Sequence, residues 1–193
     1  MGRPREFDEE EALEKVMELF WHKGYAETSM RDIAAFTGVS HAGIYNTFGD
    51  KRDIFKKALI RYDRNIGGMI IGPLEEKTSG RTEIEALFRM VESSVVAKQF
   101  KDGCLMCNTA VEFGDESGEF LNIARKNLRR MTTAFESALR RAVQRKEVRD
   151  NLDPKAVAAF LTATFHGVAI FARAQMPASY VKHTVETALR QLD

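Results

Sequence analysis

A short polar segment, Ser40–Thr47, offers side chains that can hydrogen-bond to the edges of nucleic-acid bases. Small residues at Ala42 and Gly43 would let the backbone of a helix approach a DNA groove closely, while polar neighbours supply donors and acceptors. The segment is too short and too polar to be a stable helix alone, so other helices must brace it. We therefore expect a surface recognition helix. The residues expected to face outward are His41, Ala42, Gly43, Tyr45, Asn46 and Thr47.

Cys104 and Cys107 form a second candidate site, because a spacing of three places both sulfurs on one face of a helix. A helix N-terminus, with Lys98 and Lys101 nearby, would lower the pKa of a thiol and favour its reaction with electrophiles or oxidants. Free cysteines on apolar helices are, equally, common as small core residues. A dithiol can also bind a soft metal ion, but no histidine or further cysteine stands at zinc spacing. The sequence thus leaves core and sensor roles open, and predicts neither a metal site nor a cofactor.

The first fifty residues contain the helices that would brace the polar segment. Apolar residues from Leu13 to Phe20 recur with the helical period. Ser29 is typical of the start of a second helix, which Gly38 would end. Ser40 would then cap the third helix. Two short helices joined by a tight glycine turn are the arrangement of a helix-turn-helix.

Helical periodicity continues along the rest of the chain, and no window shows the alternation of a strand. Gly67-Gly68 and Gly72-Pro73 suggest a break in composition between the N-terminal unit and the remainder. The predicted fold class is all-α, with a three-helix unit over residues 1–58 joined by a fourth helix to a larger helical unit over residues 59–193. The later helices are expected from Lys51, over residues 82–100, 103–113, 119–146 and 155–175, and after Pro177.

Composition narrows the classes of protein. The chain has 193 residues, 44% of them hydrophobic and 30% charged, which is typical of a soluble globular protein. The formal net charge is only +1, so nucleic-acid binding has to be argued from local placement of charge. Cations that would flank the recognition helix and suit phosphates are Arg3, Arg5, Lys51, Arg52, Lys56 and Lys57.

Several other classes find no support in the sequence. The N-terminus lacks the apolar core of a signal peptide, and Arg173 interrupts the longest apolar run, so we expect no membrane span and a cytoplasmic location. No P-loop, dinucleotide glycine motif, nucleophile elbow or HExxH is present, so an enzyme is not expected. Two alternatives stay open: a helical interaction module that does not bind DNA, and an activator or nucleoid-type protein that binds DNA without being released by a ligand.

The run TSMRDIAAFTGVSHAGIYNTFGDKRDIF resembles the signature of the TetR/AcrR family of bacterial repressors. Thr-Ser, Ile-Ala, Gly-Val-Ser, a Tyr, a Phe and a Lys stand at the spacing of that family, over about residues 8–58. The resemblance implies a homodimer on a palindromic double-stranded DNA operator. It also implies a C-terminal helical domain that binds an effector and dimerises mainly through the last two helices.

The resemblance assigns roles to individual residues. Those expected to hold phosphates are Thr28, Ser29, Tyr45 and Lys51. Those expected to read bases or line the groove, next to the capping Ser40, are Arg31, His41, Ala42, Gly43, Asn46 and Thr47. His41 and Phe36 are unusual choices at their positions, so no base preference follows, and Tyr45 has a second interpretation as a buried core residue.

The resemblance is weaker beyond Leu59. Helix 155–175 is small or apolar nearly all round, which favours a dimer interface with the helix after it, although both could instead be buried within their own chain. The segment GCLMCNT resembles one that recurs in a branch of the family, some of whose members respond to electrophiles or oxidants through a cysteine there. Besides the two cysteines, the candidates for a pocket that takes a small apolar or electrophilic effector are Phe88, Met106, Asn108, Phe113, Phe165 and His166.

These side chains are equally typical of an ordinary core, and the sequence leaves that choice open. The expected function is that of a ligand- or stress-responsive repressor, released from DNA when an effector binds or modifies the C-terminal domain. The fourth helix, which would span both units, is expected to transmit that change as an altered separation of the two recognition helices.

Overall fold

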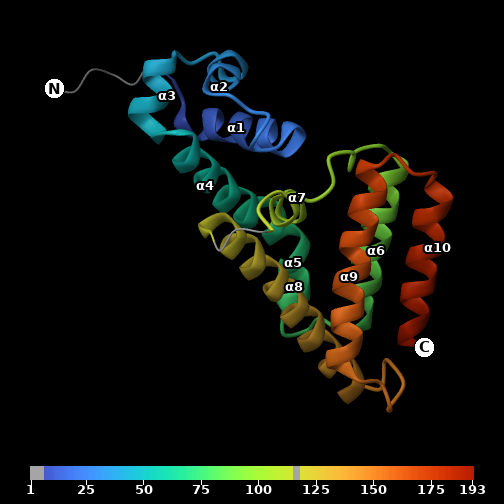
Figure 1. Cartoon of the computed structure of the whole chain (residues 1–193). Coiled ribbons are helices and arrows are strands. Elements are labelled where there is room, and N and C mark those ends of the chain that lie inside the picture. The colour runs from blue at the N-terminus through green and yellow to red at the C-terminus, as the bar shows by residue number, and fades with distance from the viewer. Residues whose placement is uncertain (1–6, 115–117) are drawn as a thin grey trace.

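The computed structural model describes residues 7–114 and 118–193, and every regular element in that part of the chain is a helix (Figure 1). The predicted all-α class is confirmed. Arg3 and Arg5, expected on a leading arm, lie outside the described residues. The helices are α1 (Glu9–Lys23), α2 (Met30–Thr37), α3 (His41–Phe48), α4 (Lys51–Tyr62), α5 (Gly68–Glu75), α6 (Arg81–Val96), α7 (Leu105–Glu112), α8 (Glu119–Gln144), α9 (Pro154–Arg173) and α10 (Ala178–Leu189).

The predicted N-terminal caps are confirmed. Ser29 and Asp32 form a reciprocal capping box at the start of α2, and the Ser40 hydroxyl accepts a hydrogen bond from the Gly43 amide at the start of α3. Gly38 ends α2 in the left-handed region, at a φ of 74°, which glycine adopts without a steric penalty. The sharp turn between α2 and α3 is therefore specified locally.

The first three helices share a core with α4. Val16 and Phe20 of α1, Ile33 of α2 and Ile44 of α3 are fully buried in it. Phe20 also packs edge-on against Phe55 of α4, with 4.8 Å between ring centres. This core holds α3 at one extremity of the molecule, with its opposite face uncovered (Figure 1).

The change in composition at Gly67-Gly68 and Gly72-Pro73 does not interrupt the secondary structure, because the chain stays helical there. A π turn over Asp63–Gly67 joins α4 to α5, and Pro73 lies inside α5. Gly67 is required for packing: a Cβ at this position would lie 3.0 Å from the Asp63 carboxylate and 3.2 Å from the amide nitrogen of Asn127 on α8. α4 continues past residue 58. The assignment of DNA binding to residues 1–58 and of effector binding and dimerisation to residues 59–193 stays a prediction.

The C-terminal helices pack around α8 and α9. In Figure 1, α6, α9 and α10 stand side by side, while α8 runs obliquely beneath α5, and α8 contacts both α5 and α9. α6 ends at Val96, before the expected Phe100, and α7 begins at Leu105 rather than Gly103. α7 lies between α8 and the end of α1, where the two parts of the molecule meet.

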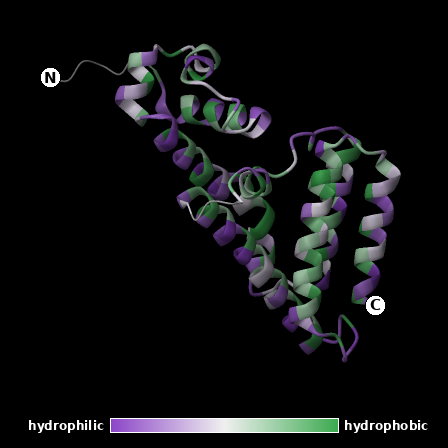
Figure 2. Ribbon diagram, in the orientation of Figure 1, coloured by the Kyte–Doolittle hydropathy of each residue, from purple (hydrophilic) through white to green (hydrophobic). Residues whose placement is uncertain are grey.

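α9 passes as a membrane span by length and composition alone, so the expectation that no segment does so is wrong. Arg173 is its last residue and therefore does not interrupt it. In this fold α9 packs against α8 and α10, and apolar residues follow it along its length (Figure 2). A core helix satisfies the same test as a membrane helix.

Arg141 of α8 fixes the loop between α5 and α6. Its guanidinium donates to the carbonyls of Ser79, at 2.8 Å, and Leu74, at 2.9 Å. Arg141, although cationic, thus stabilises the fold by bonding to this loop.

We expect Arg141→Met to lower the free energy of unfolding by about 1–3 kcal/mol, because two carbonyls lose their charged donor. Urea denaturation followed by circular dichroism measures this change. Arg140→Met is the matched control, since Arg140 is exposed and its guanidinium, among the residues that the structure describes, bonds only to Glu136 one turn away. Equal effects of the two substitutions would contradict the assignment.

Candidate nucleic-acid interface and sensor site

α3 presents the polar face that the sequence predicts. Ile44 and Phe48 point into the core, whereas His41, Ala42 and Asn46 are exposed. Tyr45 is 58% exposed, so its alternative interpretation as a core residue is wrong. This face can donate and accept hydrogen bonds at the major-groove edges of base pairs.

The edges of this face are more enclosed. Gly43 and Thr47 are half-buried, and a Cβ at Gly43 would lie 3.0 Å from Val39 and 3.2 Å from the Ser40 hydroxyl. Glycine therefore lets the first turn of α3 pack tightly against the preceding loop. The exposed part of the face is formed by other side chains, which lie before and after Gly43 in the sequence.

The start of α2 lies at the surface, with Ser29 and Arg31 exposed. Hydrogen bonds from Ser29 and from Lys23 hold the pKa of Asp32 well below its usual value. Thr28 differs from the prediction: its side chain is fully buried and its hydroxyl donates to the Gly24 carbonyl at 2.6 Å. The expected phosphate contact of the Thr28 side chain is therefore wrong in this conformation.

Lys51, at the first position of α4, is held in place by two contacts. Its Nζ lies 4.2 Å from the centre of the Tyr25 ring and donates to the Ala26 carbonyl at 3.3 Å. The charge is thus fixed beside the turn that follows α1, with the side chain half-exposed. Such a cation can contact a phosphate without first being ordered.

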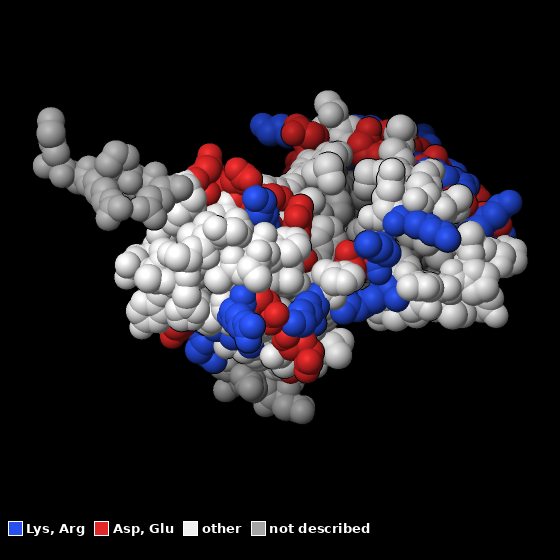
Figure 3. Space-filling model, turned by 90° about the horizontal axis from the view of Figure 1, so that it is seen from above, with Lys and Arg blue, Asp and Glu red and all other residues white. Residues whose placement is uncertain are grey.

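The surface seen from this end of the molecule carries both signs of charge. Figure 3 shows Lys and Arg interspersed with Asp and Glu instead of a single basic area. This distribution agrees with a net charge of only +1. Any contact with DNA would therefore depend on a few individual Lys and Arg side chains at the contact surface.

Glu112, the last residue of α7, ties the C-terminal helices to the N-terminal unit. Its carboxylate accepts hydrogen bonds from the backbone amides of Tyr25, at 3.0 Å, and Ala26, at 2.6 Å. Asn108 donates to the carbonyl of Asp102 at 3.2 Å. Both side chains thus bond to backbone groups.

The loop before α7 contacts α1 as well. The indole nitrogen of Trp21 donates to the carbonyl of Gly103 at 3.1 Å, and His22 lies 2.8 Å from the carboxylate of Asp102. Sequence reasoning did not identify these ties, because the paired residues are about eighty positions apart and carry no common motif. α7 is therefore bonded to the N-terminal unit at both of its ends.

The two cysteines meet a histidine from α9. The sulfurs of Cys104 and Cys107 and a ring nitrogen of His166 lie within 4.8 Å of one another. Cys104 stands at the residue before the first turn of α7 and is buried, Cys107 is half-buried, and His166 is only 9% exposed. Neither ring nitrogen of His166 has a nitrogen or oxygen partner among the described residues.

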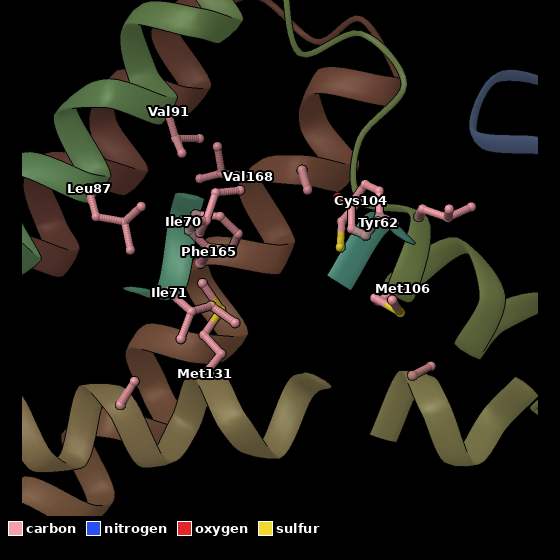
Figure 4. Packing of buried hydrophobic residues seen from close by; sticks show 14 of the residues in the cluster. Tyr62, Ile70, Ile71, Leu87, Val91, Cys104, Met106, Met131, Phe165 and Val168 are labelled. Carbon is pink, nitrogen blue, oxygen red and sulfur yellow. The ribbon is translucent and has the colours of Figure 1, made fainter. Parts of the chain in front are cut away.

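The cluster sets the protonation of its thiols. A hydrogen bond from the Cys107 thiol lowers the pKa of Cys104, with His166 adding to the effect and burial opposing it. The same hydrogen bond raises the pKa of Cys107. The causes are therefore the neighbouring thiol and imidazole, and not Lys98 and Lys101 as expected. Burial raises the pKa of Tyr62, whose hydroxyl contacts Cys104 (Figure 4).

A cavity of about 20 Å³ adjoins the cluster, at the junction of α4, α5, α8 and α9. It is far smaller than the several hundred Å³ of a typical site for an organic ligand. Figure 4 shows Ile70, Met131 and Phe165 close together beside it. Its lining residues are Tyr62, Gly67, Ile70, Ile71, Phe100, Cys104, Asn127, Met131, Phe165 and His166.

The structure separates the residues expected to form one effector pocket. Cys104, Phe165 and His166 line the small cavity. Phe88 packs behind Phe165, with 6.4 Å between ring centres, and Met106 is fully buried. Three of the expected residues thus line one cavity. Phe88 and Met106 do not line it and belong to the surrounding core.

The other three expected residues lie elsewhere. Phe113 belongs to an aromatic cluster with Phe55, Phe120 and Tyr25. Cys107 and Asn108 border a surface groove of about 550 Å³, which also contacts Val111 of α7 and Ile170 of α9. Cys107 thus stands between this groove and the cavity that Cys104 lines.

Comparison with known proteins places the chain in a family. Residues 12–58 match the model of bacterial regulatory proteins of the tetR family, and residues 80–188 match that of the tetracyclin repressor-like C-terminal domain. The transcriptional repressor ComR of Escherichia coli (strain K12) is 28% identical over 190 residues, which are 98% of this chain and 90% of ComR. The uncharacterised regulator YezE of Bacillus subtilis (strain 168) is 25% identical over 194 residues, with both chains fully covered.

A solved structure supports the same assignment of fold. The TetR family regulator CifR, in a cysteine mutant complexed with 26-base-pair double-strand operator DNA, matches this fold with a TM-score of 0.85. The match covers all of both chains at 24% identity. Since the model of the C-terminal domain alone matches more than half of the sequence and the N-terminal model matches the helix-turn-helix, this protein belongs to the TetR family of bacterial regulatory proteins.

Proposed function

We propose that this protein is a transcriptional repressor in the cytoplasm, which binds a palindromic double-stranded DNA operator as a homodimer and is released when an effector binds or modifies its C-terminal domain. The observation that carries the proposal is the exposed polar face of α3, braced from behind by Ile44 and Phe48. The relative ComR is named a repressor, and the CifR structure contains operator DNA. Proteins of the TetR family are DNA-binding regulators, in agreement with the absence of a known catalytic motif from the sequence.

Each protomer would place α3 in the major groove of one half-site. His41 and Asn46 would contact base edges, together with Arg31 from the start of α2. Tyr45 and Lys51 would contact phosphates on either side, and would set the register of the helix on the duplex. In a helix-turn-helix dimer the half-sites lie about one helical turn of DNA apart, roughly 34–36 Å.

α9 supplies the surface that we propose as the dimer interface. Ala159, Phe160, Ala163, Gly167 and Ile170 follow one another at helical spacing and are exposed or half-exposed. A Cβ at Gly167 would meet no atom within 4 Å, so a partner helix can approach closely there. An exposed apolar stripe of this kind is typical of a surface that a second subunit covers.

The path from effector to DNA would run through α7. An electrophile in the groove next to Val111 would reach Cys107 first, with Cys104 directly behind it. A displacement of α7 would then act on the turn after α1 through Glu112, and Lys51 is bonded to that same turn. Two discrete arrangements of α7 would thus give two positions of the recognition helix.

Selection of duplexes from a random pool by the purified protein tests DNA binding when the operator sequence is not known. We expect an enriched sequence with two inverted half-sites. A gel shift with that duplex then gives the affinity and its dependence on salt. Failure to retain any DNA at low ionic strength would overturn the proposal.

Release is tested with the small thiol reagent methyl methanethiosulfonate. We expect treatment to weaken operator binding about 5- to 150-fold, the usual range of a coupling between two sites. Cys104→Ser combined with Cys107→Ser should abolish the response, and Glu112→Ala should diminish it, because α7 loses its bonds to the turn after α1. Fluorescence anisotropy of labelled operator measures each affinity before and after treatment.

Glu136→Ala is the matched control for Glu112→Ala, since Glu136 pairs with Arg140 on its own helix and, within residues 7–114 and 118–193, with no other cation. If Glu112→Ala and Glu136→Ala respond alike, coupling does not pass through α7. If the double cysteine variant is still released, the reagent acts elsewhere.

A further inference from the structure

The cysteine and histidine cluster has the geometry of a metal site. Three ligand atoms that each lie about 2.0–2.3 Å from one ion are separated from one another by about 3.3–4.0 Å. The two sulfurs and the His166 nitrogen already lie within 4.8 Å of one another. Small rotamer changes would therefore suffice to bring all three to one ion.

His166 independently indicates a missing partner. Buried polar groups in proteins normally have hydrogen-bond partners, and neither ring nitrogen of this imidazole has one among the nitrogen and oxygen atoms of the described residues. The cavity beside it, at about 20 Å³, has the volume of an ion or a single water and not of an organic molecule. The partner is thus small.

The ligand types select the class of ion. Thiolates and imidazole bind soft or borderline metals, whereas Mg²⁺ and Ca²⁺ require oxygen ligands. The cluster contains no carboxylate, and Asn127, which also lines the cavity, already donates to Asp63 at 2.6 Å. The thioether side chain of Met131, another soft group, lies on the same cavity.

We propose that Cys104, Cys107 and His166 form a binding site for one thiophilic d10 metal ion. Two sulfurs and one nitrogen complete the coordination of Cu(I), whereas Zn(II) would need a fourth ligand. Binding displaces the thiol protons to solvent, so that the ion offsets the charge of the buried sulfurs.

The ligands come from the start of α7 and from the middle of α9, while Tyr62 of α4 lies against Cys104. An ion would therefore join α7 directly to α9. If the proposed repressor function holds, the ion is an effector, because α7 also bonds to the turn beside Lys51. The binding site itself does not depend on that function.

The test is a titration of the reduced, metal-free full-length chain under nitrogen. Cu(I) is added in competition with a chromophoric Cu(I) chelator, and Zn(II) is added in a separate titration against a zinc-binding dye. We expect one equivalent of one of these ions per chain. Mutation of outer-shell groups alone costs about 10–100-fold in metal affinity, so Cys104→Ser, Cys107→Ser and His166→Phe should each cost at least that much.

His183→Phe is the matched control, because His183 is exposed on α10. Circular dichroism verifies that each variant folds, and Cys107→Ser, which alters a half-buried side chain by one atom, keeps the test valid if His166→Phe does not fold. Binding of neither ion, or binding that Cys107→Ser leaves unchanged, would overturn the site. Binding with no change in operator affinity would support the site and remove its role as an effector site.

Discussion

Lys51→Glu is expected to weaken operator binding by about ten- to hundredfold, the largest loss that a single change at the proposed DNA surface should cause. The substitution removes one phosphate contact and places a negative charge against the DNA backbone. Because Lys51 is already held by the Tyr25 ring and the Ala26 carbonyl, its charge needs no ordering when DNA binds. The measurement is fluorescence anisotropy with the selected operator at several salt concentrations, in which the slope of log affinity against log salt should also become shallower.

Lys77→Glu is the control for this charge reversal, since Lys77 is exposed in the loop between α5 and α6. The two variants have the same net charge, so a difference between their operator affinities would arise from the position of the substituted residue. A comparable loss of affinity in both variants would mean that only the total charge matters. It would leave α4 without a specific role in binding.

Ala163→Glu is expected to separate the proposed homodimer into monomers. Ala163 is exposed at the middle of the apolar stripe on α9, so a two-fold interface there would bury two new carboxylates opposite apolar side chains. Light scattering on a sizing column should give the mass of one chain. Operator affinity should fall about 10²–10⁴-fold, because each half-site would then be bound independently.

Thr133→Glu introduces the same side chain at an exposed position of α8 and should leave the mass unchanged. Because Ala163 is exposed within its own chain, Ala163→Glu should retain the helical circular dichroism of the parent protein. A dimer that persists in Ala163→Glu would place the interface away from this part of α9.

The features that could be predicted from the sequence are those set by neighbouring residues. Ser29, Gly38 and Ser40 each act within one helical turn, through a cap or a left-handed φ, and the structure has each of them as predicted. The outward face of α3 followed from the spacing of Ile44 and Phe48. Such signals act over a few neighbouring residues, so the rest of the chain has little influence on the structure that they specify.

The errors and omissions concern distant residues. Gly67 has the composition of a loop, yet its small size serves the packing of a helix against Asn127 on α8. His166 stands 59 positions after Cys107, and only the placement of α9 beside α7 brings their ligand atoms together. Glu112 likewise reaches Tyr25 through the fold, and no spacing in the sequence indicates that contact.

The π turn at Asp63–Gly67 absorbs one extra residue between the two ends of the molecule. A π turn holds one residue more than the α-helical turn it replaces, whereas one residue of an α-helix corresponds to about 100° of rotation. Loss of a single residue at this turn would therefore convert it to an α-helical turn and leave α3 facing nearly the same way relative to α9. Loss of a residue within α4, with the π turn retained, would instead rotate α3 by about 100° around that axis.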